Sequence, residues 1–337
     1  MPVSVAVIGA VGAGKTTLFN ALTGGRGADG VGMVDVPDGR LQLLADAVSP
    51  KKIVPAQVRV ADAPPGSRAQ RIAAAREADV VIKVARCFGP DPDPAGDLEG
   101  LELDLALTDL ATVEKRIEIV GREVRAGKKG GAEELAVLEL AKAHLDQGQG
   151  LRTLKLEPEQ RELLKGVFPV SDKPSIFVAN VSDSQLPDGG ELADRVRKVA
   201  AAQGAEAIVL SAQLELELAE LEPADAGDYR ATYGLTEASL ERAARAVWDA
   251  GGLITYFTAG EPEVRAWPCI ADAPAPVAAA VIHSDFERHF IRAEVTSVDE
   301  LVAAGSMEAL RTAGKLRVEG KEYRVRDGDV IFFRIGR

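Results

Sequence analysis

The stretch that most constrains the fold is Val3 to Leu22, where an apolar run leads into a glycine loop and then into a helical pattern. Val3 to Ile8 is rich in β-branched residues, which is typical of a buried parallel strand. The spacing G-x-x-x-x-G-K-T is complete from Gly9 to Thr16, and apolar residues from Leu18 onward recur at helical spacing. A strand, a glycine loop and a helix in this order predict a phosphate-binding loop in an α/β fold.

Each residue type in this loop has a chemical reason. Glycines let backbone N–H groups approach an anion, and the following helix adds the positive end of its dipole. Lys15 is expected to reach the β- and γ-phosphates as a catalytic residue, and the Thr16 hydroxyl to ligate Mg²⁺. The residues predicted to bind the phosphates are Gly9, Gly12, Ala13, Gly14, Lys15, Thr16 and Thr17.

Asp62 follows the next predicted strand, which spans Ile53 to Val60. An aspartate at such a strand end holds a second Mg²⁺ contact, directly or through water, so Asp62 is the other catalytic and metal candidate. The alternative is that Asp62 only forms a turn before Pro64 and Pro65.

Two further predicted strands, Pro174 to Ala179 and Ala207 to Leu210, deliver short polar motifs. GTPase-like folds read the nucleotide base at N-x-x-D after one strand and at Ser-Ala after the next. Their order behind the glycine loop predicts a purine site made by Asn180, Val181, Asp183, Ser211 and Ala212.

The α/β pattern is interrupted by two charged helical segments, Leu103 to Val124 and Ala132 to Leu145, which predict an antiparallel hairpin. After Gly251-Gly252 the chain becomes a run of short strands and turns. We therefore expect three domains. They are a nucleotide-binding domain over 1–90 and 172–252, an inserted helical hairpin over 91–171, and a small α+β domain over 253–337.

Charge and cysteine content limit the partners. A formal charge of −12 excludes a chain-wide nucleic-acid or membrane coat, and no DNA partner is expected. The segment Arg311 to Arg337, with eight Arg or Lys against four Asp or Glu, keeps a local basic face open. Cys87 and Cys269 are too few for a disulfide framework and are expected to be buried. No apolar run is long enough to span a membrane, so a soluble, cytoplasmic protein is expected.

The residues resemble one family, the YchF/Obg-like ATPases, which are P-loop GTPase-related proteins of the TRAFAC class. The similarity covers nearly the whole chain and is carried by GKTTLFNALT at Gly14, VPDGRL at Val36 and ITYFTAGEPEVRAW at Ile254. It is also carried by AAAVIHSDFERHFIRAEV at Ala278 and GKEYRVRDGDVIFFRI at Gly320. The resemblance implies a Ras-like nucleotide domain, an inserted helical hairpin and a C-terminal β-grasp (TGS) domain. It also implies ATP rather than GTP as the ligand, with Mg²⁺, and association with the ribosome.

This chain departs from the family pattern at the expected active site. Gly12 stands where the family carries an Asn linked to monovalent-cation-assisted hydrolysis. The loop Gly24 to Gly32 contains no Mg²⁺-binding Thr, and Pro65 stands where D-x-x-G needs Gly. Asp183 fills the last place of a motif that usually ends in Glu. We therefore predict nucleotide binding with slow or lost hydrolysis.

Three alternatives remain open at this point. An active ATPase or GTPase coupled to the ribosome is favoured by the intact Lys15 and Thr16. A nucleotide-independent module that binds RNA or the ribosome would depend on the basic C-terminal segment. GTP is the alternative ligand, because Asp183 could accept two hydrogen bonds from guanine.

Overall fold

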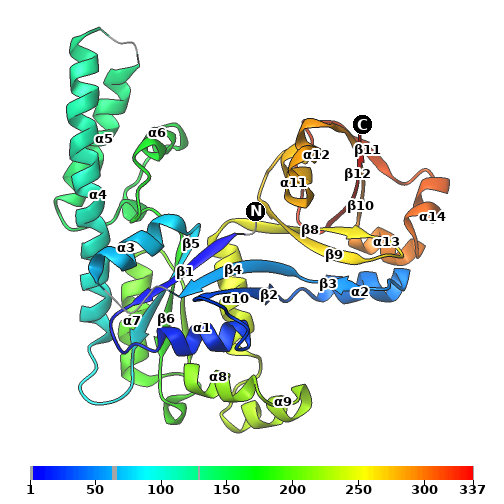
Figure 1. Cartoon of the computed structure of the whole chain (residues 1–337), viewed down its shortest axis with the longest axis horizontal. Helices are drawn as coiled ribbons and strands as arrows, with labels where there is room; N and C mark the ends of the chain where they lie inside the picture. Colours follow the sequence, from blue (N-terminus) through cyan, green and yellow to red (C-terminus); the bar gives the residue numbers. More distant parts are fainter. Residues whose placement is uncertain (1–2, 63–66, 128–129, 337) are drawn as a thin grey trace. The chain divides into compact units, whose positions relative to one another are not determined.

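The computed structural model describes residues 3–62, 67–127 and 130–336, which fold into two compact units. The P-loop unit comprises residues 4–32 and 60–243, and the C-terminal unit comprises residues 33–59 and 244–336 together with Val3 (Figure 1). The division into three domains stays a prediction.

A six-stranded sheet has the order β2-β4-β1-β5-β6-β7, and its strands β1, β5, β6 and β7 lie in the P-loop unit. Strands β1, β5, β6 and β7 pair in parallel, with Gly9 opposite Val84, Arg86 opposite Asn180, and Asn180 opposite Leu210. Their carboxyl ends therefore meet at one edge of the sheet, which is where ligands bind in open α/β sheets. The strands are β1 (Ser4–Gly9), β2 (Val31–Val36), β4 (Ala56–Asp62), β5 (Val80–Arg86), β6 (Ser175–Asn180) and β7 (Ala207–Leu210).

Helices cover this sheet, and one of its faces packs on α3, α4 and α7. Ala6, Ile8 and Val81 of the strands pack with Ala75 of α3, while Phe177 packs with residues of α7. The helices of this part of the chain are α1 (Lys15–Thr23), α3 (Arg68–Glu77), α4 (Pro94–Arg125), α5 (Gly131–Leu145), α6 (Pro158–Leu164), α7 (Gly190–Ala202), α8 (Ala212–Leu218), α9 (Pro223–Thr232) and α10 (Ser239–Ala250), with 3₁₀ turns η1 (Leu151–Thr153), η2 (Lys165–Val167) and η3 (Asp183–Gln185).

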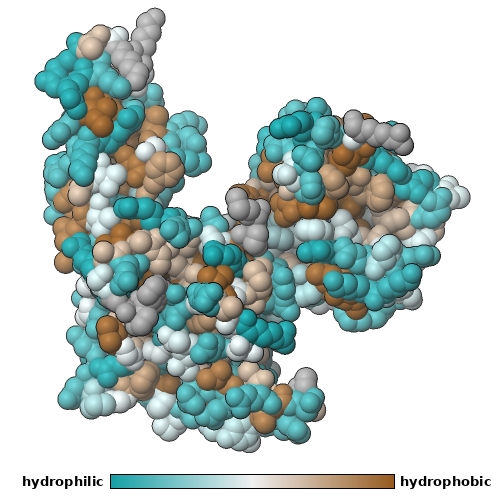
Figure 2. Space-filling view, viewed as in Figure 1, coloured by the Kyte–Doolittle hydropathy of each residue, from teal (hydrophilic) through white to brown (hydrophobic). Residues whose placement is uncertain are grey.

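The expected helical hairpin is present as α4 and α5, whose apolar residues pack on each other (Figure 1). Its first helix begins earlier than the sequence predicts, at Pro94 rather than Leu103. The Asp93 side chain accepts a hydrogen bond from the Gly96 N–H, and proline needs no partner in the first turn of a helix. The helix therefore starts at a proline, a residue that would break it at an interior position. The visible surface of the hairpin is largely hydrophilic, with isolated apolar residues, as expected for a solvated arm (Figure 2).

A buried charge cluster joins α4 to the sheet. Lys83 of β5 and Glu102 of α4 form an ion pair, and both are nearly inaccessible to solvent. Arg152, in η1, lies 3.6 Å from the second Glu102 oxygen and donates to Ser175 Oγ at 2.7 Å. Burial lowers the pKa of Lys83 to about 8, against the opposing effect of Glu102.

The structure corrects one predicted strand. The sequence predicts a single strand over Ile53 to Val60, but β3 (Ile53–Val54) and β4 lie in different sheets. Pro55 separates them, and its missing N–H cannot contribute to a strand ladder. Ile53 pairs with Val264 in the C-terminal unit, so the chain leaves one sheet and joins the other at this proline.

The C-terminal unit has its own six-stranded sheet, with the order β11-β10-β12-β8-β9-β3. The sequence predicts short strands and turns here, and the segment Leu316 to Val325 contains both, because Arg317–Glu319 is a strand and Tyr323 N donates to Gly320 O in a turn. The remaining strands and helices of this unit are α2 (Gly39–Val48), β8 (Leu253–Ala259), β9 (Val264–Ile270), α11 (Ala275–Ile282), α12 (Ser284–Arg288), β10 (Phe290–Ser297), α13 (Val298–Ala304), α14 (Met307–Thr312), β11 (Arg317–Glu319) and β12 (Asp329–Ile335).

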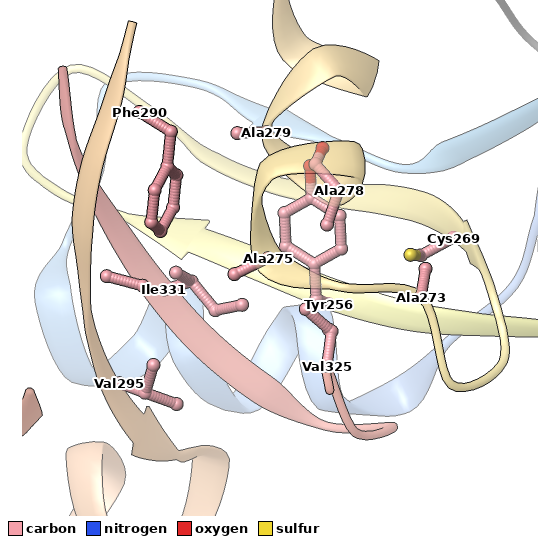
Figure 3. Packing of buried hydrophobic residues seen from close by; sticks show 11 residues of the cluster. Tyr256, Cys269, Ala273, Ala275, Ala278, Ala279, Phe290, Val295, Val325 and Ile331 are labelled. Atoms are coloured by element: carbon pink, nitrogen blue, oxygen red, sulfur yellow. The ribbon is translucent and has the colours of Figure 1, made fainter. Parts of the chain in front are cut away.

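The core of this unit lies between α11 and the sheet, as Figure 3 shows. Tyr256 is fully buried in it, and its hydroxyl donates to Ala278 O at 2.9 Å, so the buried polar atom is satisfied. Small alanines on α11 let the helix approach the strands closely. Both cysteines are buried, as predicted, and burial raises the pKa of Cys269 to about 11 and that of Cys87 to about 12.

Helix α2, although encoded between the glycine loop and Asp62, belongs to the C-terminal unit. Arg40 of α2 pairs with Asp38 at 2.7 Å and with Asp327 at 2.5 Å, and its guanidinium lies over the Phe257 ring. The segment VPDGRL is therefore a packing element of this unit. Among the described residues, no helix combines the length and the apolar character needed to cross a membrane.

Candidate functional site

The glycine loop lies between the end of β1 and the start of α1, and two of its glycines are required by close contacts. A Cβ atom on Gly9 would lie 2.3 Å from the carbonyl oxygen of Val84. A Cβ atom on Gly14 would lie 2.2 Å from Asn180 Nδ2, and Gly14 has a φ of +85° as the N-cap of α1. Gly12 also has a positive φ, of +78°, but faces open space.

Lys15 opens α1 and folds back over the loop. Its Nζ donates to the Ala10 carbonyl oxygen at 2.8 Å. Partial burial lowers the pKa of Lys15, while the nearby Asp62 carboxylate acts in the opposite direction. The Lys15 ammonium is thus held at the loop, where a phosphate oxygen can replace the Ala10 carbonyl oxygen as its hydrogen-bond acceptor.

Thr16 and Asp62, the two predicted Mg²⁺ ligands, are in direct contact. The Thr16 hydroxyl donates to Asp62 Oδ2 at 2.7 Å, and the Asp62 N–H donates to Gly30 O at 2.9 Å. The other carboxylate oxygen, Asp62 Oδ1, is buried and has no hydrogen-bond partner among the described residues. A buried acidic oxygen without a donor, beside a hydroxyl, fits a hard cation such as Mg²⁺. The predicted turn over Pro64 and Pro65, and the D-x-x-G position, lie outside the described residues.

Asn180 connects the glycine loop to the predicted base-reading motif after β7. Its Nδ2 donates to Ala13 O at 2.9 Å, and its Oδ1 accepts from the Ala212 N–H at 2.9 Å. Asn180 is buried, so both of these groups depend on it. Asn180 thus supports the glycine loop from the end of β6.

The remaining predicted base-reading residues also come together, with one difference in orientation. The Ser211 hydroxyl donates to Asp183 Oδ1 and accepts from the Leu214 N–H, capping α8. The Val181 side chain is 2% exposed and packs in the core with Phe177 and Ala193, so it is turned away from solvent. Thr17, on the first turn of α1, is partly exposed.

The sequence analysis does not single out Arg71, which the structure places close to this site. The positive charge of Arg71 lowers the pKa of Lys15, and its guanidinium lies 3.5 Å from the Asp104 carboxylate of α4. The sequence feature that could have indicated Arg71 is its position on the first helix after Asp62. In the described part of the chain, no group of three or more His, Cys, Asp or Glu side chains is arranged to hold a metal by itself. Mg²⁺ here would depend on nucleotide phosphates for further ligands.

A parallel sheet that ends in a glycine loop, with a Lys-Thr pair opening the next helix, places this chain in the P-loop class of α/β proteins. Comparison with known proteins narrows this class. Residues 253–336 match the family model YchF-GTPase_C, described as "Protein of unknown function (DUF933)". A Bacillus subtilis protein named Ribosome-binding ATPase YchF is 38% identical over 99% of this chain and 99% of its own length. A Haemophilus influenzae protein of the same name is 36% identical over 97% of this chain and 98% of its own length.

A solved structure of the Schizosaccharomyces pombe YchF GTPase superposes with a TM-score of 0.86 and 26% identity, covering 98% of this chain and 97% of that one. The chain belongs to the YchF family. The resemblance found in its motifs is thereby confirmed, as are the α/β P-loop fold and a C-terminal domain consistent with the TGS type.

Proposed function

We propose that this protein binds a purine nucleoside triphosphate, ATP in preference to GTP, with Mg²⁺ at the glycine loop, and that it associates with the ribosome. The observation that carries the nucleotide part is that four groups from three separate segments of the chain meet around one loop. They are the Lys15 ammonium, the Thr16 hydroxyl, the Asp62 carboxylate and the Asn180 amide. The family relatives named Ribosome-binding ATPase YchF support the ribosomal part.

The Mg²⁺ ion would be held by Thr16 Oγ1 and by the unpartnered Asp62 Oδ1. When bound, it would neutralise charge on the β- and γ-phosphates. The protein's own contribution is positional. The glycine loop presents N–H groups, the start of α1 adds its dipole, and Lys15 adds a point charge beside Ala10.

Slow or lost hydrolysis is part of the proposal. Turnover needs a positioned water molecule and charge stabilisation at the transferred phosphoryl group. Gly12 offers no side chain at the loop, and the 24–32 segment holds no threonine hydroxyl. Losing one such helper commonly costs roughly 10²- to 10³-fold in rate. An active ATPase is the second candidate, supported by the intact contact between Thr16 and Asp62.

The base preference is supported by the contact between Ser211 and Asp183. Guanine would need the Asp183 carboxylate to accept two N–H donors, and the Ser211 hydroxyl, which donates to one of its oxygens, uses part of that acceptor capacity. Adenine makes no such demand, since it presents no N1–H donor.

Binding and turnover are to be measured separately on the full chain. Fluorescent ATP and GTP analogues in Mg²⁺ should bind, with ATP tighter, and Lys15→Ala should weaken both. Turnover of about 1 s⁻¹ or more, abolished by Lys15→Ala, would contradict slow hydrolysis. The preference for ATP would be overturned if the unchanged protein bound GTP more tightly than ATP and the Asp183→Ala variant lost GTP binding alone.

A further inference from the structure

An exposed part of the C-terminal sheet carries three arginines around one carboxylate. Arg292 lies opposite Arg334, and Glu294 lies opposite both Phe332 and Val318 in the strand register. Residues that are paired directly across antiparallel strands project from the same face, as do residues two apart. We name this surface the arginine face, and it comprises Arg292, Glu294, Arg311, Val318, Phe332 and Arg334.

The sheet is buried on its other face and only half covered on this one. Ala293, Val295 and Ile331 project into the core with Tyr256. On the arginine face, Thr296 and Val330 are fully buried at one end. At the other end Phe332 is 45% exposed and Val318 is 63% exposed. The exposed Val318 and Phe332 flank Glu294 on this face, so its open end offers apolar side chains to a ligand.

Glu294 orients the arginines without neutralising them. Its carboxylate accepts from Arg334 Nε at 3.0 Å and from Arg311 Nη2 at 2.8 Å, and Arg292 Nη2 lies 3.6 Å away. Glu294 is buried, whereas each arginine side chain keeps at least 40% of its surface exposed. Arg311 also pairs with the exposed Glu308, so three guanidinium groups share two carboxylates. The arginines therefore lose little side-chain entropy when a ligand arrives.

The arginines and Phe332 form one stacking surface. The Arg334 guanidinium lies 4.4 Å from the centroid of the Phe332 ring. An aromatic ring and guanidinium planes on an open sheet are the groups on which unpaired bases stack, while further cations track the backbone phosphates. An acidic protein with net charge −12 needs a local cationic surface of this kind to approach RNA.

We infer that the arginine face is the surface by which this protein docks single-stranded RNA, with a base on Phe332 and phosphates on Arg292, Arg311 and Arg334. This inference deepens the proposed ribosomal association and rests on it only for the source of the RNA. The nucleotide site plays no part, because no residue of the glycine loop belongs to the arginine face.

The test uses the full-length protein and a fluorescently labelled single-stranded RNA of about 12 nucleotides, which is within the usual site size. Binding is followed by fluorescence anisotropy over a series of salt concentrations. Phe332→Ala should weaken binding roughly 5- to 100-fold, because one stacked base is lost, and Phe332→Tyr should retain it. Arg334→Gln should weaken binding and reduce the salt slope by about 0.7.

Arg324→Gln is the matched control, since Arg324 lies in the same unit, is exposed, and donates to Asp272 O away from the arginine face. It should leave affinity close to that of the unchanged protein. Equal affinity of Phe332→Ala and the unchanged protein, or an equal loss for Arg324→Gln and Arg334→Gln, would overturn the inference. So would displacement of the RNA by a polyglutamate peptide of equal length at equal concentration, which would indicate an acidic protein partner.

Co-sedimentation with ribosomes separates this inference from the proposed function. If the unchanged protein and Phe332→Ala sediment equally, the ribosomal association stands and the arginine face is wrong. If the unchanged protein binds RNA through Phe332 but does not sediment, the arginine face stands and the ribosomal association is wrong.

Discussion

The Thr16 hydroxyl donates a hydrogen bond of 2.7 Å to Asp62 Oδ2, joining the first turn of α1 to the last residue of β4. The two residues are 46 positions apart, and most of the intervening chain folds into the C-terminal unit. This contact holds the threonine and the aspartate ready for one cation, and it leaves Asp62 Oδ1 without a partner.

Removing the Asp62 charge should therefore affect the cation more than the nucleotide. We expect Asp62→Asn to weaken nucleotide binding in Mg²⁺ by roughly 10-fold or more, because a hydrogen bond to a charged group is worth about 1.5–3 kcal/mol. Binding in EDTA should change little. Isothermal titration with and without Mg²⁺ measures both, and an equal loss under the two conditions would count against Asp62 as a metal ligand.

Asn180→Ala should damage the protein in two ways. The Ala13 carbonyl and the Ala212 N–H would both lose their partner in a buried place, at a cost of about 1–3 kcal/mol each in free energy of unfolding. Nucleotide affinity should fall as well, because the glycine loop would lose its support. Chemical unfolding and analogue binding are the two measurements. The exposed Ser184→Ala, one residue beyond the motif that ends at Asp183, serves as a control expected to change neither.

The pair formed by Lys83 and Glu102 should show the asymmetry of buried ion pairs. Glu102→Gln leaves a buried ammonium without its carboxylate and should cost about 3–5 kcal/mol. The double variant Lys83→Met/Glu102→Gln removes both charges and should recover part of that loss. A double variant less stable than Glu102→Gln would contradict this account of the pair.

The same lysine predicts a pH dependence. Its pKa is about 8 in the folded protein and about 10.5 in the unfolded chain, so between these values the unfolded state binds more protons. The free energy of unfolding contributed by Lys83 should therefore rise with pH across this window, by at most about 1.4 kcal/mol per pH unit. Comparing the unchanged protein with Lys83→Met over this range isolates the effect, which should vanish in the variant.

Glu294 should give a dependence of the same sign at acid pH, with stability rising as the pH rises. Hydrogen bonds from Arg334 and Arg311 lower the pKa of Glu294 to about 2, below the 4.5 of an ordinary glutamate. Its contribution to stability is complete above the unfolded value and is lost as the pH falls toward 2. Both tryptophans, Trp248 and Trp267, lie in the C-terminal unit, so tryptophan fluorescence follows its acid unfolding. Glu294→Gln should make this unfolding less steep with pH, and an unchanged acid profile would argue that Glu294 has no such role.

Local patterns predicted the elements well where one physical signal dominated. The strand at Ala207–Leu210 has the predicted bounds, because its apolar run and its flanking residues agree. The start of α4 was missed because a proline breaks the interior of a helix but is accepted in its first turn. Only the capping by Asp93 shows that Pro94 lies in a first turn.

The sequence by itself determined the glycine loop, the order of the strands along the chain and the membership of the YchF family, because these depend on residue type and spacing. Only the tertiary structure decided that Thr16 contacts Asp62, that Asn180 bridges the loop to Ala212, and that the Val181 side chain is buried. It also decided that residues 33–59 belong with the C-terminal unit, and that three arginines gather beside Phe332. These relationships join residues that are far apart in the chain. They depend on strand register and helix packing, and no local sequence pattern contains that information.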